Sequence, residues 1–88
     1  MISATQVRAA RALLGIDQRE LSQLSGLSLP TIQRMEASTG LQIRGNVDSL
    51  MKLVAALDAA GIELIGENVM SVGEGRGVRL KSISSEAL

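Results

Sequence analysis

The sequence predicts a mainly α fold: a bundle of about four helices followed by a short C-terminal β-hairpin or dimerisation strands. Three observations predict it. Residues that cap helix N-termini recur just before segments with apolar residues three and four apart. Glycines follow these segments, where helices commonly end. Beyond Gly61 the apolar spacing changes to alternation, which is typical of strands. With 88 residues, the chain has room for one domain.

The first two helices each begin with the spacing of a capping box. Ser3 and Gln6 form the first box, and Gly15 is a suitable end for the helix that follows. Asp17 and Glu20 form the second box, at the start of a short helix over about 18–25. Gly26 then supplies the backbone conformation of a tight turn.

The third helix is predicted from a cap and a proline. Ser28 is the cap, and Pro30 falls in the first turn, where its missing N–H has no helical partner to lose. Ile32 and Met35 lie three residues apart and are expected to face the core. The outward positions of this helix then carry polar side chains, namely Thr31, Gln33 and Arg34.

A polar loop over 37–45 leads to the fourth helix, which Asn46 is expected to cap and Gly61 to end. Its predicted apolar stripe consists of Leu50, Leu53, Val54 and Leu57. We divide the chain into a helical domain over 1–61, a β segment over 62–81 and a flexible tail over 82–88.

The composition excludes several kinds of chemistry. The chain contains no cysteine, histidine or aromatic residue. Thiolate catalysis, most zinc sites and the usual general base are therefore missing, as are the stacking platforms that bind single-stranded nucleic acid. We expect no enzyme, no metal, no cofactor and no small-molecule ligand. No apolar segment long enough to cross a membrane and no signal-peptide layout is present, so we expect a cytoplasmic protein and no membrane partner.

The charge is zero overall but unevenly distributed. Residues 1–45 carry five basic and three acidic groups, whereas residues 46–88 carry four basic and six acidic groups. The positive half thus coincides with the second and third helices, which favours a polyanionic partner for that part of the chain.

Two short helices joined by a tight turn, with longer helices before and after, follow the helix-turn-helix plan. The residues in these positions resemble the lambda-repressor-like, or XRE, family of helix-turn-helix regulators over residues 3–60. The residues that carry the resemblance are Gln18, Glu20, Leu21, Gly26, Ser28, Thr31, Ile32, Arg34 and Glu36.

The resemblance implies that the third helix lies in the major groove of DNA while the second crosses the phosphates. Hydroxyl, amide and guanidinium groups on the third helix can read base edges, and an apolar pair can pack on thymine methyls. Gln18 matches a glutamine that binds phosphate, and Arg44 matches a loop arginine that reaches the minor groove in some members. The expected DNA-binding residues are Gln18, Ser28, Leu29, Pro30, Thr31, Gln33, Arg34 and Arg44. The alternative is that these side chains form an ordinary solvated helix face.

Arg11 and Glu36 match the positions of a salt bridge that the family often buries, so the resemblance implies a structural role for both. At the other end of the chain, a lone pair of strands is marginally stable in water and its edge invites a partner. We expect Ile62, Leu64, Val78 and Leu80 to hold a homodimer together, the alternative being a hairpin folded back on the fourth helix of a monomer.

The function expected from these observations is a sequence-specific transcriptional regulator that binds double-stranded DNA, in the form of a dimeric repressor of a palindromic operator. One alternative is an antitoxin that binds both operator DNA and a toxin partner. Another is a protein-interaction module that uses the helix-turn-helix fold to bind protein. Retardation of duplex DNA that is lost as salt rises would distinguish the first two from the third.

Overall fold

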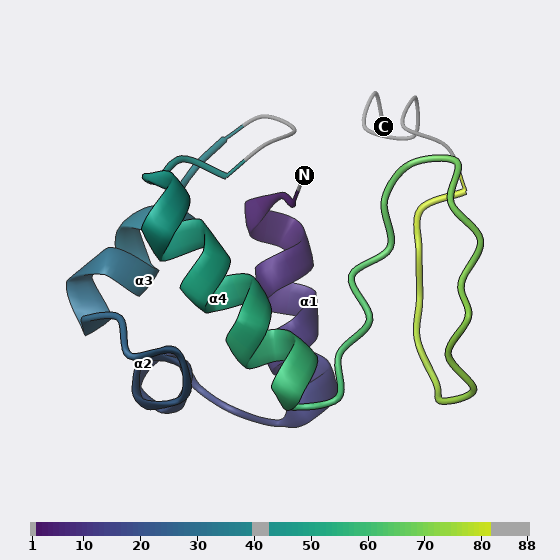
Figure 1. Cartoon of the computed structure of the whole chain (residues 1–88), viewed down its shortest axis with the longest axis horizontal. Helices are drawn as coiled ribbons and strands as arrows, with labels where there is room; N and C mark the ends of the chain where they lie inside the picture. Colours follow the sequence, from purple (N-terminus) through teal and green to yellow (C-terminus); the bar gives the residue numbers. More distant parts are fainter. Residues whose placement is uncertain (1, 40–42, 82–88) are drawn as a thin grey trace.

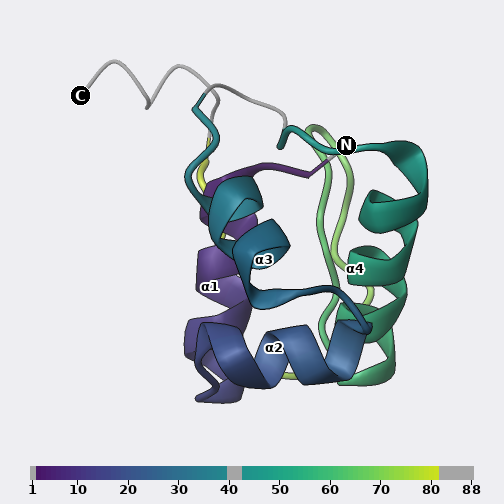
Figure 2. The ribbon, with the colours of Figure 1, turned by 90° about the vertical axis from the view of Figure 1, so that its left-hand side faces the viewer.

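The structure is a computed structural model that describes residues 2–39 and 43–81. Its described part contains four helices: α1 (Ala4–Leu14), α2 (Gln18–Ser25), α3 (Leu29–Glu36) and α4 (Val47–Ala59) (Figure 1). Helices α2 and α3 together form one face of the molecule (Figure 2), and the chain after α4 runs along the opposite side. Within the described ranges, no helix combines the length and the apolar character needed to cross a membrane.

Each helix begins at the residue that the sequence predicts. The side chains of Ser3, Asp17, Ser28 and Asn46 accept hydrogen bonds from backbone N–H groups three residues further on. In α1 and α2 the glutamine or glutamate at that third position also accepts from the backbone of the cap, so both capping boxes are complete. These contacts satisfy N–H groups that have no partner inside a helix.

The turn between α2 and α3 depends on Gly26, which has φ +74° and lies in the left-handed region. The hydroxyl of Ser22 donates to the carbonyl of Leu27 over 2.5 Å and so ties α2 to the turn. Because this turn is tight, the position of α2 fixes the orientation of α3.

The core lies where α2 packs against both α3 and α4, and where α1 packs against α3. All of its members are aliphatic or methionine, since the chain has no aromatic residue. The buried members are Val7, Ala10, Leu21, Leu27, Ile32, Met35, Ile43, Leu53 and Leu57. Val54, which the predicted stripe of α4 includes, is exposed instead.

The predicted C-terminal β-hairpin is wrong. No strand forms in the described residues 62–81, although this part of the chain does double back on itself (Figure 1). Ile62 and Leu64 are half-buried and pack against the core, so the start of the segment is anchored as a coil rather than as a strand. The side-chain amide of Gln6 strengthens this anchor by donating to the carbonyl of Ile65 over 3.1 Å.

Side chains, rather than a β-ladder, hold residues 66–81 in place; we call this segment the C-terminal arm. The Glu63 carboxylate accepts from the Ser71 hydroxyl and from the backbone N–H groups of Val72 and Gly73, at 2.6, 2.8 and 3.2 Å. Arg79 donates to two backbone carbonyls within the arm, those of Val69 and Gly66. Ile62 and Leu64 pack against the core, whereas Arg79 is bound to carbonyls at Gly66 and Val69. The two segments that alternation predicted as strands are therefore held by different partners and do not pair. The predicted flexible tail over 82–88 lies outside the described residues.

Candidate nucleic-acid interface

The outer side of α3 carries most of the residues predicted to bind DNA. Pro30, Gln33 and Arg34 are exposed, while Leu29 and Thr31 are half-buried. Ile32 and Met35 on the opposite side of the helix are almost fully buried. The apolar side of α3 is therefore anchored in the core. Its other side faces solvent, with apolar residues in the first turn and polar residues after it.

Ser28 and Thr31 lie together at the start of α3. The Ser28 hydroxyl accepts from the Thr31 backbone N–H at 3.3 Å, and the two hydroxyl oxygens are 2.8 Å apart. The cap thus fixes the side chains of both residues. A hydroxyl in such a pair keeps spare acceptor capacity, so it can still meet a polar group approaching from outside.

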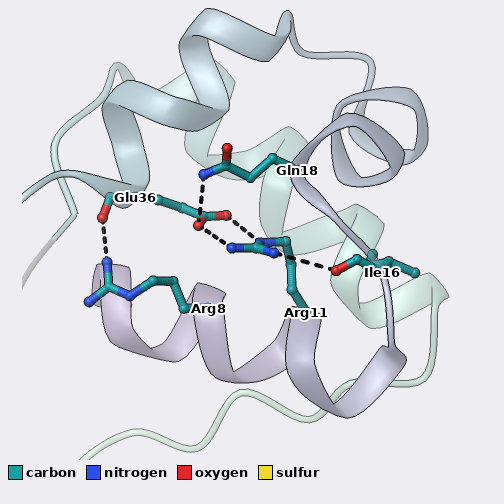
Figure 3. Close-up of polar contacts among 5 residues, drawn as sticks. All are labelled: Arg8, Arg11, Ile16, Gln18 and Glu36. Atoms are coloured by element: carbon teal, nitrogen blue, oxygen red, sulfur yellow. Dashed lines mark hydrogen bonds and ion pairs between the residues drawn. The ribbon is translucent and has the colours of Figure 1, made fainter.

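Behind this face, the carboxylate of Glu36 joins three helices (Figure 3). Glu36 is the last residue of α3, and only 4% of its surface is exposed. Arg11 of α1 donates to both carboxylate oxygens, from Nε at 2.8 Å and from Nη2 at 2.7 Å. Gln18 of α2 donates to Oε1 over 3.1 Å. This is the ion pair that the family resemblance implies, with Gln18 as a third member.

The Arg11–Glu36 pair has the geometry that offsets the cost of burying charge. Bidentate arginine–carboxylate contacts are among the strongest hydrogen bonds in proteins. The hydrogen bonds to Glu36 raise the pKa of Arg11 above its ordinary value, against the opposing effect of burial. The remaining Arg11 donor, Nη1, reaches the carbonyl of Ile16 at 3.4 Å, just before α2 begins. The pair therefore fixes α3 relative to both α1 and α2.

Gln18 has two roles available to it. One N–H of its amide is used in the bond to Glu36, which leaves the second N–H and the amide oxygen free for other partners. Because Gln18 is the first residue of α2 and only half-buried, these atoms can meet a phosphate at the edge of the interface.

The sequence did not indicate a role for Arg8, because an arginine at such a position is usually a solvated charge. Its guanidinium Nη1 donates to the backbone carbonyl of Glu36, at the end of α3 (Figure 3). A cation there satisfies a carbonyl without a helical partner and complements the negative end of the helix dipole. The spacing could have indicated this role. Arg8 lies three residues before Arg11 on the same helix, and residues with this spacing lie on one side of a helix.

Arg34 and Arg44 come together although they are ten positions apart in the sequence. Both line a shallow hollow between the end of α3 and the loop that precedes α4, together with Ala37, Ser38, Thr39 and Gly45. Ser38, another residue that the sequence did not single out, connects the two segments. Its hydroxyl donates to the Arg34 carbonyl at 3.4 Å and accepts from the Arg44 backbone N–H at 3.1 Å. The hollow is therefore rimmed by two exposed guanidinium groups.

The charge of this face is positive where α3 ends. Among the described residues, Arg34, Arg44 and Arg19 make no salt bridge, whereas the one buried carboxylate of the region, Glu36, is neutralised by Arg11. The same part of the chain holds no cluster of acidic residues suited to a metal ion. An anionic partner with polar edges fits such a surface better than an apolar one.

The four residues predicted for dimerisation do not share one environment. Ile62 and Leu64 contact the core of their own chain, whereas Val78 and Leu80 project from the C-terminal arm and are exposed. Only the latter two are free to contact another molecule without rearrangement of the core.

In the comparison with known families, a family model described as helix-turn-helix matches residues 7–60. The matched part includes α2 and α3 with their turn, as well as α4 and most of α1. No curated protein and no solved structure matches the chain.

Proposed function

Since the chain belongs to the lambda-repressor-like (XRE) helix-turn-helix family of DNA-binding transcriptional regulators, we propose that it binds a specific double-stranded sequence through α3. In this proposal α3 enters the major groove and α2 lies across the sugar-phosphate backbone. Arg34 donates to a guanine, Ser28, Thr31 and Gln33 contact neighbouring base edges, and the half-buried Leu29 with Pro30 packs against thymine methyls.

The observation that carries this proposal is the way α3 is held. Its inner side is fixed by Ile32 and Met35, and its last residue is clamped by Arg11 and Gln18. A helix held in this way suits base readout, because discrimination depends on hydrogen bonds whose geometry is fixed before binding.

Selection from a library of randomised duplexes tests the proposal. We expect a defined sequence to be enriched, and its affinity to fall linearly with the logarithm of the salt concentration, as phosphate contacts require. A shuffled duplex of the same composition is the matched control. Enrichment of no sequence, together with equal binding to the control, would contradict sequence-specific recognition.

We further propose that the protein acts as a dimeric repressor on a palindromic operator in the cytoplasm. The net charge of residues 1–45 is only +2, so one copy should bind weakly, while a second linked copy binds at high effective concentration. Half-sites should then lie roughly 34 Å apart, one turn of DNA. The exposed Val78 and Leu80 support the C-terminal arm as the part that joins the copies.

Truncation after Gly66 tests the dimer without disturbing the core, because it keeps Ile62, Leu64 and the Ile65 carbonyl that Gln6 contacts. We expect the truncated chain to sediment as a monomer, to keep its helical circular dichroism and to lose most of its affinity for the palindrome. A full-length chain that sediments as a monomer while binding the palindrome tightly would contradict the dimer.

A second candidate function is that of an antitoxin, and the position of the arm favours it as the alternative. The C-terminal arm lies on the side of the molecule away from α3 (Figure 1), so it could hold a protein partner while α3 holds DNA. Co-purification of the full chain with the product of a neighbouring gene, lost on truncation after Gly66, would support this reading over the simple repressor.

A further inference from the structure

Large apolar side chains that face solvent are concentrated in two places on the described chain. Of ten such residues, three lie on α4 and five lie on the C-terminal arm. Those on α4 are Val47, Met51 and Val54; those on the arm are Val69, Met70, Val72, Val78 and Leu80. Concentrated exposure of this kind, unlike scattered apolar residues, marks a surface that another surface covers.

The three residues on α4 form one stripe along the helix, which we call the α4 stripe. Their spacing of four and then three residues places them on the same side. Val47 is 71% exposed and Met51 66% exposed, so neither is covered by its own chain. Leu53 and Leu57, which face the core, are fully buried. The helix thus has one apolar side in the core and a second one in solvent.

The arm of the same chain does not cover the α4 stripe. Gln6 holds Ile65 to α1, and Glu63 and Arg79 fix the fold of the arm beyond it. With these contacts in place, Val72 remains 86% exposed and Leu80 69% exposed. The α4 stripe and the apolar residues of the arm are therefore both exposed in one chain. Two copies could cover both of these surfaces by contacting each other.

Charge favours the same pairing. The arm carries Arg76, Arg79 and Lys81 against Glu67 and Glu74, for a net charge of +1. Helix α4 carries Asp48, Asp58 and Lys52, for a net charge of −1. On α4, Asp48 pairs with Lys52 at 3.4 Å, which leaves Asp58 as the carboxylate of the helix without a salt bridge among the described residues. An arm with a net charge of +1 is attracted to this helix, whereas two arms of the same net charge repel each other weakly.

We propose that the C-terminal arm of each copy packs on the α4 stripe of the other, in a reciprocal exchange. This rests on the proposed dimer and names the surface that the arm contacts. The contact obeys two-fold symmetry, so it occurs twice in the dimer and buries both apolar surfaces of each chain.

Disulfide trapping tests the exchange directly, since the chain has no cysteine of its own. Full-length Met51→Cys and Leu80→Cys chains, distinguished by a mass tag, are mixed and gently oxidised. We expect disulfides between the two different chains to exceed those between identical chains. Leu13→Cys, an exposed position on α1 outside the stripe, replaces Met51→Cys in the control and should lose this excess.

Sedimentation of Met51→Asp provides a second measurement. The residue is exposed in the single chain, so helical circular dichroism should remain while the dimer is lost. Leu24→Asp, at an exposed position on α2, should leave the dimer intact. Disulfides formed mainly between two Leu80→Cys chains, or a Met51→Asp chain that still dimerises, would overturn the exchange but leave the dimer standing. A wild-type chain that sediments as a monomer would overturn both.

Discussion

The Arg11 guanidinium and the Glu36 carboxylate form a bidentate ion pair at the centre of three helices, with Nη2 2.7 Å from Oε1. The Glu36 side chain is 3% exposed and that of Arg11 is 21% exposed. The pair lies behind the outer face of α3 and takes no part in it. In the proposed function its contribution to DNA binding is indirect, because it fixes the position of the helix whose other side would meet the ligand.

Removing Arg11 should leave the buried Glu36 carboxylate without its ion-pair partner. We expect Arg11→Ala to lower the free energy of unfolding by about 3–5 kcal/mol, as when one partner of a buried pair is lost. Urea denaturation measures this, with Arg19→Ala as the exposed control. Replacing both partners by apolar residues (Arg11→Met with Glu36→Leu) should recover much of the loss. A single variant as stable as the control would show that the pair contributes nothing.

Gln18→Ala should weaken DNA binding evenly across sequences, because in the proposed docking the amide contacts phosphate rather than a base. We expect an unchanged preference at every base pair, with lower affinity for specific and shuffled duplexes alike. Fluorescence anisotropy on both duplexes measures the two affinities. The variant also loses the bond to Glu36, so its unfolding curve has to be recorded in parallel. A change in the preferred sequence would assign Gln18 to base readout instead.

Lowering the pH should release the turn of the C-terminal arm that Glu63 holds. The hydrogen bond from the Ser71 hydroxyl, then that from the Val72 backbone, holds the pKa of Glu63 below its ordinary 4.5. A lowered folded-state pKa means that the stabilisation is present above pH 4.5 and is lost as the pH falls through the folded value. We expect the amide resonances of Val72 and Gly73 to shift in that range.

Glu63→Gln should shift the amide resonances of Val72 and Gly73 to their low-pH positions already at neutral pH. Glu67→Gln, which changes an exposed glutamate nearby, should leave these resonances where they are in the wild type. Amide resonances that titrate identically in wild type and Glu63→Gln would show that another group controls the turn.

The sequence predicted α1 to α4 well because the signals there are local. Helix α2 illustrates this, because its cap Asp17, the capping-box partner Glu20 and the terminal Gly26 all lie within one short segment. The Arg11–Glu36 pair was implied by the family pattern, although the two residues are 25 positions apart.

The C-terminal arm could not be predicted in the same way. Alternating Val78 and Leu80 satisfy the pattern of a strand, but a ladder forms only if the partner segment is available. Ile62 and Leu64 pack against the core instead, and Arg79 contacts the carbonyls of Val69 and Gly66. No local pattern reveals such distant contacts. The roles of Arg8 and Ser38 were missed for a related reason, since each depends on where the end of α3 lies in space.

In the proposed function α3 reads bases, and Arg34 is one of the residues that read them. An Arg34→Ala variant tests this in a duplex selection run beside wild type, followed by affinity measurements on every single-base variant of the selected site. We expect a loss of about 1–3 kcal/mol in binding the selected site and a relaxed preference at one base pair, with the preferences at the other base pairs kept. An Arg34→Ala protein that selects the same sequence with the same affinity would contradict it.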